Sequence, residues 1–453
     1  MNKVPKVITH VVNNDLCTGC GLCTSFCDSK ALKMDWNEFG FLVPHEINDC
    51  TDESDCLSVC PFNPFPEETV KTETEIANLF FPDDTTTKKL EKLGKYKNTY
   101  VGYSNEFRAT SSSGGIASYV TKQLFERNII EYVVNVQQVG EKFEYSINKK
   151  GNPVVKSSKT RYYPVTMDKV FQKIEELDGN VAIVSIPCFL KGVRLAQYQR
   201  PALKEKINFT IGIICGGVKS KFFTEYLTQK AGAFNDDVEK VEYRVKNLDS
   251  TAGDYSFGVK VAGKEDLKTV KMRSLGDMWG TGLFKCNACD FCDDVSGELA
   301  DIALGDAWIR PYVNDGGGTN VMITRSNLAD TIIKQGMSNG DLHADDLPES
   351  EFIRSQKGSF THRQDCLPYR ADKLSNIENI PPKRPRKKRL SPEVKLIQKK
   401  RRETRKQSLL IWKDNPNVDF FDLKMKPYLK SLRSITKFNH YKRGIIDRMK
   451  RMF

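Results

Sequence analysis

The feature that most constrains this chain is a run of four cysteines close to its first residue. The gaps between them are two, two and three residues, at Cys17, Cys20, Cys23 and Cys27. This spacing lets a short loop place three thiolates on one cubane cluster and lend the fourth to a second cluster. Gly19 and Gly21 allow the loop to stay tight. The run therefore predicts iron–sulfur clusters.

A second set of cysteines completes the pattern of a two-cluster ferredoxin. It consists of Cys50, Cys56 and Cys60, followed by Pro61. In the crossed ligation of such domains, one [4Fe–4S] cluster takes Cys17, Cys20, Cys23 and Cys60. Zinc is the competing metal, but it usually takes four ligands from two separated pairs. The spacing therefore favours clusters.

The other N-terminal site is one thiolate short. Its cysteines are Cys27, Cys50 and Cys56, and Glu53 stands where another thiolate is expected. We expect either a [3Fe–4S] cluster or a [4Fe–4S] cluster with a carboxylate ligand from Glu53, Asp52 or Asp55. Residues 31–34 and 41–43 read as short strands around a turn at residues 37–40. An α+β ferredoxin-like domain is thus predicted over residues 1–63, and residues 64–96 are predicted to be a linker with one helix, at 73–80.

From residue 97 the pattern changes to alternating strands and helices. Residues 100–103 and 130–136 read as strands, separated by a Ser/Gly loop at 108–115 and a helix from Ile116. We expect this to be a βαβ unit. The amides and hydroxyls at its helix start suit an anion such as a cofactor pyrophosphate, although a plain capped turn is the commoner meaning of such a loop.

Two further strands each run into a cysteine. Residues 181–186 lead to Cys188, and residues 207–214 lead to Cys215. In open α/β sheets, ligands gather at this carboxyl edge. A third group follows a predicted hairpin at residues 255–272, and we expect a four-thiolate site from Cys188, Cys215, Cys286 and Cys289, with Cys292 as the spare. The alternatives are zinc at the clustered cysteines and simple burial of the two single ones. Cys366 is expected to be structural.

Charge divides the chain unevenly. The 453 residues carry a net charge of +12, yet residues 383–453 hold 24 Lys and Arg against 6 Asp and Glu, so the preceding body is acidic. After Pro427, apolar residues recur on one helical face among basic ones, which suits an anionic membrane surface or an acidic partner. A solvated tail is the plain alternative. Nucleic-acid binding is not expected, because no recognition motif is present.

The composition also limits the function classes. No run of about 18–20 apolar residues is present and no apolar run follows Met1, so we expect a cytoplasmic protein whose cysteines bind metal. Contact with the inner face of a membrane would then be peripheral, through residues 383–453. With 5 His and no readable Ser–His–Asp arrangement, hydrolytic chemistry is not indicated.

Four motifs in order resemble the family of β-subunits of coenzyme F420 hydrogenases and dehydrogenases. They are RATSSSGG at 108–115, PCFLKGVR at 187–194, CGGVKS at 215–220, and CNACDFC with ADIALGDAW between 286 and 308. The resemblance covers residues 97–325 and divides them into an N-terminal-type region, 97–170, and a C-terminal-type region within 171–330. Residues 331–382 are then a connecting segment, followed by the helical basic tail.

The resemblance implies an α/β flavin-binding domain with FAD and a [4Fe–4S] cluster. It implies electron transfer between F420 or another small-molecule acceptor and a redox partner, either a ferredoxin or part of a dehydrogenase or hydrogenase. Bacterial members often accompany polysaccharide biosynthesis. The implied contacts to FAD or substrate are Ser111, Ser112, Ser113, Gly114, Gly115, Asp301, Gly305 and Asp306. Ser185 and Ile186 replace the Gly-Thr that many members have before Pro187 and Cys188, which puts F420 itself in question.

Overall fold

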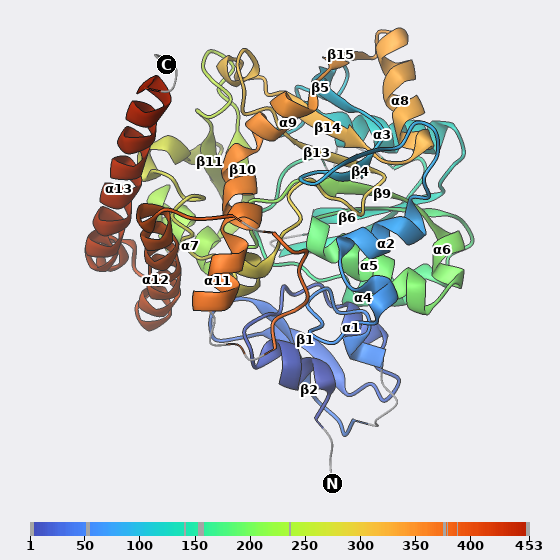
Figure 1. Cartoon of the computed structure of the whole chain (residues 1–453), viewed down its shortest axis with the longest axis horizontal. Helices are drawn as coiled ribbons and strands as arrows, with labels where there is room; N and C mark the ends of the chain where they lie inside the picture. Colours follow the sequence, from blue (N-terminus) through green and yellow to red (C-terminus); the bar gives the residue numbers. More distant parts are fainter. Residues whose placement is uncertain are drawn as a thin grey trace.

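The computed structural model describes residues 4–50, 55–139, 142–152, 158–234, 237–374, 377, 379–386 and 388–449. An N-terminal module lies at one end of the molecule, a large mixed sheet fills the centre, and the C-terminal helices run along one side (Figure 1). None of the described helices contains an apolar stretch long enough to cross a membrane.

The N-terminal module contains α1 (Leu22–Ser25) and the antiparallel strands β1 (Leu32–Trp36) and β2 (Leu42–Glu46). The predicted turn is present, because the Gly40 N–H donates to the Asn37 carbonyl at 3.0 Å. The next segment carries α2 (Glu73–Phe80), as predicted, and adds the small pair β3 (Lys88–Leu90) and β4 (Gly94–Tyr96). Thr72 and Glu75 form a capping box that fixes the start of α2.

The central sheet has eight strands in the order β15-β5-β14-β13-β9-β8-β6-β7. Strands β6, β8, β9 and β13 are parallel to their neighbours within this group. The bounds are β5 (Thr99–Ser104), β6 (Tyr132–Val139), β7 (Lys142–Lys149), β8 (Val181–Ser185), β9 (Ile207–Ile213), β13 (Ile302–Asp306), β14 (Asn320–Thr324) and β15 (Leu342–Asp346). The strand β15 comes from the segment predicted as connecting.

One sequence expectation fails in its pairing. β5, helix α3 (Ile116–Glu126) and β6 follow one another as predicted, but β14, β13, β9 and β8 lie between the two strands. Hydrophobic periodicity identifies the elements and carries no information on which strands become neighbours. The sequence β8, α5 (Pro187–Gln199), β9 does form an adjacent parallel unit.

Alternate side chains along the strands form two cores. Val133, Ala182 and Leu304 face α3 and α8 (Asn327–Ser338), whereas their chain neighbours face α5 on the other side. The N-terminal module docks on that second face, where Leu22 and Phe26 join the core. Helices α4 (Asp168–Ile174), α6 (Ala202–Lys206), α9 (Glu349–Ser355) and α10 (Lys357–Phe360) also lie there.

A second sheet holds β10 (Val238–Val245), β11 (Ser256–Val261) and β12 (Leu267–Lys271), so the predicted hairpin at 255–272 is confirmed. Helix α7 (Lys221–Lys230) packs on it. The remaining helices are α11 (Leu367–Leu374), α12 (Pro392–Asp414) and α13 (Val418–Met449). α12 and α13 lie side by side (Figure 1). Trp412 is fully buried and Phe421 stacks on Phe284 at 4.9 Å, so this part of the tail packs on the body. α13 begins before Pro427 and runs through it.

Candidate functional site

The carboxyl ends of several sheet strands meet at one edge, and most of the predicted site residues lie there. The loop 108–115 follows β5, Cys188 follows β8, Cys215 follows β9, and Asp306 ends β13. These strands all point the same way, since β5 is reached from β13 through two antiparallel steps. This is the edge where α/β sheets bind ligands.

Four cysteines line a small cavity at this edge: Cys188, Cys215, Cys289 and Cys292. Cys188 lies in the first turn of α5, where Pro187 occupies the first helical position. Cys289 lies on a short 3₁₀ helix, Asn287–Phe291, and Cys292 caps its end. Burial, followed by the charges of Cys292, Cys215 and Cys289, raises the pKa of Cys188 well above its usual value. The four sulfurs therefore face one another.

N–H groups already point at three of these sulfurs. The Gly217 N–H donates to Cys215 Sγ at 3.3 Å, and the Val218 N–H donates to Cys289 Sγ at 3.2 Å. The Arg363 guanidinium donates to Cys292 Sγ at 3.6 Å. Burial opposes the charge of Arg363, yet the sulfurs outweigh it and raise the pKa of Arg363. Such donors stabilise thiolates around an iron–sulfur cluster, so the residues of the cavity fit a cluster. Nothing in the sequence singled out Arg363, which follows α10 in the connecting segment.

The pair of clustered cysteines that lines the cavity differs from the predicted pair. Cys286, predicted as a ligand, is outside the cavity, and its thiol donates to the Cys17 carbonyl at 3.2 Å. Cys292, predicted as the spare, lines the cavity instead. Cys286 precedes the 3₁₀ helix as its cap, and the helix carries the later two cysteines inward. The Cys286 thiol, with help from Lys285 and Arg363, lowers the pKa of Cys289 to about 6. Cys366 is buried apart from this group.

The predicted first N-terminal site is assembled next to this cavity. Burial and the charge of neighbouring cysteines raise the pKa of Cys17 to about 12 and also raise those of Cys23 and Cys60. For Cys20, burial raises the pKa to about 11. Gly19 and Gly21 have φ of 83° and 80°, a region that other residues rarely adopt. The structure thus brings three cysteines of a tight loop together with Cys60, which comes from a later segment.

The N-terminal loop and the cysteine cavity are in direct contact. Thr18 and Phe62, which flank the loop cysteines, line the cavity. The Met167 N–H donates to the Cys20 carbonyl at 2.9 Å, and the Ser25 hydroxyl donates to the Asp168 carbonyl at 3.4 Å. Two cysteine sites thus lie back to back across a fixed seam.

The second N-terminal site is placed farther out. Cys27 is buried and accepts the Ala31 N–H at 3.3 Å, Cys56 is buried, and Cys50 is half-exposed. Glu53 and Asp52, the predicted carboxylate ligands, lie outside the described residues, and so does the side chain of Asp55.

The Ser/Gly loop folds back on the ends of β13 and β14. The Ser113 hydroxyl donates to the Thr319 carbonyl at 3.3 Å, and Ser112 Oγ accepts the Thr160 N–H at 2.9 Å. Gly115 caps α3 with φ of 81°, and no side chain caps the helix amides. A Cβ on Gly114 would lie 2.8 Å from the Gly102 carbonyl oxygen, so only glycine fits there. The buried Ser111 hydroxyl has no partner among the described residues.

The last three predicted positions lie on or next to β13, but at opposite ends of the strand. Gly305 accepts the Asn320 amide at 3.1 Å, and Asp306 receives both hydrogen bonds of Arg244, at 2.9 and 2.8 Å. These two lie at the carboxyl edge. Asp301 lies at the opposite end of β13, where it is buried and accepts hydrogen bonds from Arg194 and Thr210. The structure therefore does not bring Asp301 to the loop.

Basic and aromatic side chains that sequence reasoning missed complete this edge. Lys246 donates to the Arg108 and Ser113 carbonyls at 2.6 and 2.9 Å, and burial, with the charges of Arg108 and Arg244, lowers the pKa of Lys246 to about 8. Buried nitrogens of Arg161 and Arg244 lack partners among the described residues. Tyr162 and Trp279 lie 4.6 Å apart, edge to face. Orphaned donors, cations and aromatic rings together form a cradle that fits a phosphate-bearing aromatic cofactor.

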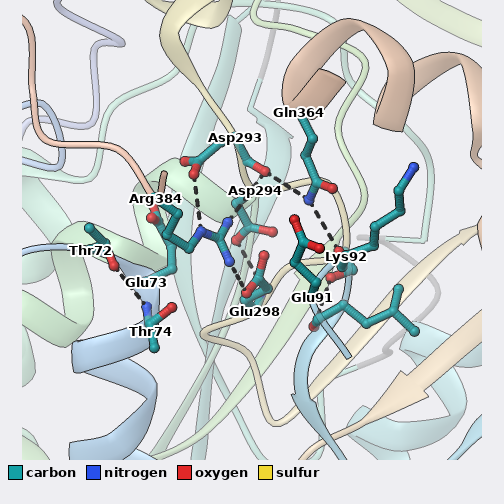
Figure 2. A network of polar contacts seen from close by, with 12 residues as sticks. Thr72, Glu73, Thr74, Glu91, Lys92, Asp293, Asp294, Glu298, Gln364 and Arg384 are labelled. Atoms are coloured by element: carbon teal, nitrogen blue, oxygen red, sulfur yellow. Dashed lines mark hydrogen bonds and ion pairs between the residues drawn. The ribbon is translucent and has the colours of Figure 1, made fainter. Parts of the chain in front are cut away.

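A buried ionic network is built on the residues that follow Cys292 in the chain, Asp293 and Glu298, and on Arg384 (Figure 2). Arg384 Nε donates to Asp293 Oδ2 at 3.1 Å, and Arg384 Nη1 donates to Glu298 Oε2 at 2.5 Å. Glu73 pairs with Lys191, one turn after Cys188, at 3.1 Å. Lys383 lies over the Phe62 ring at 5.3 Å. The first basic residues of the predicted tail are therefore built into the body, beside the cysteine cavity.

Comparisons with known proteins give matches to three family models. Two family models described as the beta subunit of coenzyme F420 hydrogenase/dehydrogenase match the chain: the model of its N-terminal part at residues 99–172, and the model of its C-terminal part at residues 178–350. Residues 16–63 match a 4Fe–4S dicluster domain. Together the first two ranges cover more than half of the chain.

Two curated relatives come from methanogens. A coenzyme F420-dependent sulfite reductase of Methanocaldococcus jannaschii is 23% identical over 77% of this chain, which spans 50% of that protein's length. One of the subunits of the F420H2 dehydrogenase of Methanosarcina mazei is 21% identical over 80% of this chain and 95% of its own length. In the F420-reducing [NiFe] hydrogenase complex from Methanosarcina barkeri, one chain aligns with a TM-score of 0.48 at 18% identity, covering 64% of this chain and 99% of that one.

Proposed function

The chain belongs to the family of coenzyme F420 hydrogenase/dehydrogenase β-subunits, and on that premise we propose that it is an iron–sulfur flavoprotein oxidoreductase. It would pass electrons between its ferredoxin-type clusters, FAD and an organic acceptor. The proposal is carried by the arrangement of three redox-suited sites. The N-terminal loop touches the cavity lined by Cys188, Cys215, Cys289 and Cys292, and the cradle lies at the same carboxyl edge, where Trp279 comes close to Gly216, the residue after Cys215.

The cradle supplies what FAD requires. Ser111, Arg161 and Arg244 offer buried polar atoms that no described residue satisfies, and a buried donor without a partner costs about 1–3 kcal/mol. A bound pyrophosphate would accept such hydrogen bonds, and Lys246 adds charge. When bound, FAD accepts two electrons as a hydride and releases them singly, which matches clusters that carry one electron each.

The order of the sites suggests the route. The first N-terminal site touches the cavity through Thr18 and Phe62, whereas the site of Cys27, Cys50 and Cys56 is farther from it and includes the half-exposed Cys50. We place the protein redox partner at the outer site and the organic substrate at the cradle. Electrons would pass through Cys17, Cys20, Cys23 and Cys60 between them.

F420 is the first substrate to test, because the names of both methanogen relatives contain it. Ser185, at the position where many family members have glycine, is buried, and its hydroxyl lies 2.6 Å from the Tyr145 hydroxyl. Ser185 ends β8, three residues before Cys188, so the pair can alter the shape of a substrate site at this edge.

Peripheral membrane contact is a separate part of the proposal. The last turns of α13 expose Phe438, Tyr441, Ile445 and Met449, which recur on one helical face with Lys437 and Arg443 beside them. Such a face suits an anionic bilayer. Ile445→Glu should abolish co-sedimentation with phosphatidylglycerol vesicles if this face inserts, and unchanged co-sedimentation would refute it. Truncation after Pro382 is not a clean test, because it removes the buried Arg384.

The deciding experiment is to purify the full chain without oxygen and measure iron, sulfide, zinc and flavin. We expect FAD and about 11 to 12 iron atoms per chain, the lower value if the outer site holds three irons. A well-folded sample with clusters and no flavin would contradict the proposal and would indicate a non-enzymatic electron carrier. Reduction of bound FAD by reduced F420 would identify F420 as the substrate. Reduction by other hydride donors but not by reduced F420 would indicate a different substrate.

A further inference from the structure

A second cavity, of about 360 Å³, opens between the C-terminal helices and the loop that follows β12. It is far larger than the cysteine cavity and shares no lining residue with it. α12 contributes Arg401, α13 contributes Arg433, Lys437 and His440, and the loop contributes Asp277 and Thr281. Apart from the basic tail taken as a whole, none of the predicted site residues lies here, and Lys437 also flanks the exposed face of α13 described above.

The cations of this cavity are unpaired. Among the described residues, Arg401, Arg433 and Lys437 form no ion pair with a carboxylate. Arg401 Nε is buried without any hydrogen-bond partner. Arg433 lies against the turn at Gly276, where a Cβ would come within 2.8 Å of its guanidinium. The cavity thus carries three positive charges: Arg401 Nε is buried, whereas Arg433 and Lys437 are exposed, and Lys437 lies over the Tyr441 ring at 5.7 Å. Together these charges give the hollow a positive potential that attracts an anion.

The single carboxylate in the cavity is already committed elsewhere. Asp277 Oδ1 accepts the Trp279 and Gly280 N–H groups at 3.2 and 2.6 Å. Oδ1 therefore holds the loop in shape, while the charge of Asp277 only partly offsets the burial that lowers the pKa of Arg401. Against three permanent cations, one carboxylate leaves a net charge of +2, which complements the charge of about −2 on a phosphomonoester.

We propose that this cavity binds the phosphate group of a small phosphorylated ligand. Two guanidinium groups give the planar, forked donors that hold phosphate oxygens in pairs. The Thr281 and Thr436 hydroxyls line the same space. The volume lies within the range of small-molecule sites, so a phosphate with a compact organic group fits.

The site is linked to the redox centre through its loop. Trp279, between Asp277 and Gly280, packs edge to face on Tyr162, and a Cβ on Gly216 would lie 3.1 Å from its ring. Gly216 directly follows Cys215. A ligand held by the loop therefore lies two residue contacts from the cysteine cavity, and Trp279 gives a fluorescence signal for its arrival.

The test is calorimetry on the anaerobically purified full chain, with inorganic phosphate, glucose 1-phosphate and AMP as soluble probes. Vesicles of phosphatidylcholine with phosphatidylglycerol serve as the lipid probe. The double variant Arg433→Gln/Lys437→Gln is compared with Lys424→Gln/Lys430→Gln, which removes the same charge from exposed positions of α13 outside the cavity. We expect at least about tenfold weaker binding in the first variant only, the loss of one or two charge-assisted contacts.

The probes separate the sources of the phosphate. Saturable binding of a soluble probe that depends on Arg433 and Lys437 supports a soluble ligand. Binding of vesicles alone with the same dependence supports a lipid headgroup as the source. No saturable binding of any probe, or equal weakening in both double variants, overturns the proposal. Iron and flavin contents should be unchanged in both variants, so the result does not depend on the proposed redox function.

Discussion

The N-terminal cysteine loop and the internal cysteine cavity both bring cysteine side chains together, but they do so in different ways. In the loop, Cys17, Cys20 and Cys23 lie within seven residues and meet because the chain turns tightly at Gly19 and Gly21, so that only Cys60 comes from elsewhere. In the cavity, four cysteines meet only because β8, β9 and a short 3₁₀ helix end at the same place. The geometry of the loop is set by local turns, whereas the geometry of the cavity depends on the whole fold and on charges distant in the chain, such as Arg363 and Arg384. The cavity should therefore be the more fragile of the two.

The sharpest way to break this comparison is to remove one cavity cysteine. Cys292→Ser should lose about four iron atoms per chain and stop electron transfer between cofactor and N-terminal clusters, because its thiolate lines the cavity. Cys286→Ser is the matched control and should keep its full iron content. Equal losses in the two variants, measured by iron analysis and electron paramagnetic resonance, would restore Cys286 as a ligand.

The second largest effect should come from Arg384. Arg384→Met leaves Glu298 buried without its ion-pair partner and leaves Asp293 only the longer contact with Lys383 at 4.0 Å, which costs about 3–5 kcal/mol of unfolding free energy. Denaturant titration should show this loss, and the cavity cluster should disappear before the N-terminal clusters. Lys388→Gln, whose half-exposed pair with Asp365 is worth under about 1 kcal/mol, is the control. Stability equal to the control would mean that the network is not needed.

These two variants also mark how much the sequence predicts. The cysteine loop, the strands before Cys188 and Cys215 and the helix Glu73–Phe80 follow from spacing and periodicity, which are local. Which of Cys286 and Cys292 lines the cavity depends on how the 3₁₀ helix Asn287–Phe291 packs against the N-terminal loop. The pairing of Arg384 with Asp293 joins residues far apart in the chain. No spacing rule reports such contacts, since they exist only after the sheet has formed.

A smaller change should separate the two regions by potential. Arg363 donates to Cys292 and to the Cys215 carbonyl. Arg363→Gln removes its charge, so the reduced cavity cluster is less stabilised and its potential should fall by about 60 mV, equivalent to about 1.4 kcal/mol for one electron. Redox titration of the same sample gives the N-terminal clusters as an internal reference, and a parallel shift of all clusters would contradict a local effect.

The smallest predicted effect is a pH dependence at the cradle. Burial lowers the pKa of Lys246 to about 8, below its unfolded value, and a bound phosphate would raise this pKa again. Protonated Lys246 therefore favours the anion, and retention of FAD should weaken several-fold as pH rises from 7 to 9. Fluorescence of released flavin measures this. Lys246→Gln should bind more weakly and show a flatter profile; an unchanged profile would exclude Lys246 from the cofactor site.

The seam between the N-terminal loop and the body has a consequence for how fast electrons can move. Met167 and Asp168 are hydrogen-bonded to the Cys20 carbonyl and to Ser25. The N-terminal loop is therefore held in one position against the body of the protein. Carriers on tethers exchange electrons only as often as they collide, so solvent viscosity slows them. Here the site of Cys17, Cys20, Cys23 and Cys60 stays at one distance from the cysteine cavity. Electron transfer between them should therefore have the same rate in buffer and in concentrated sucrose solution.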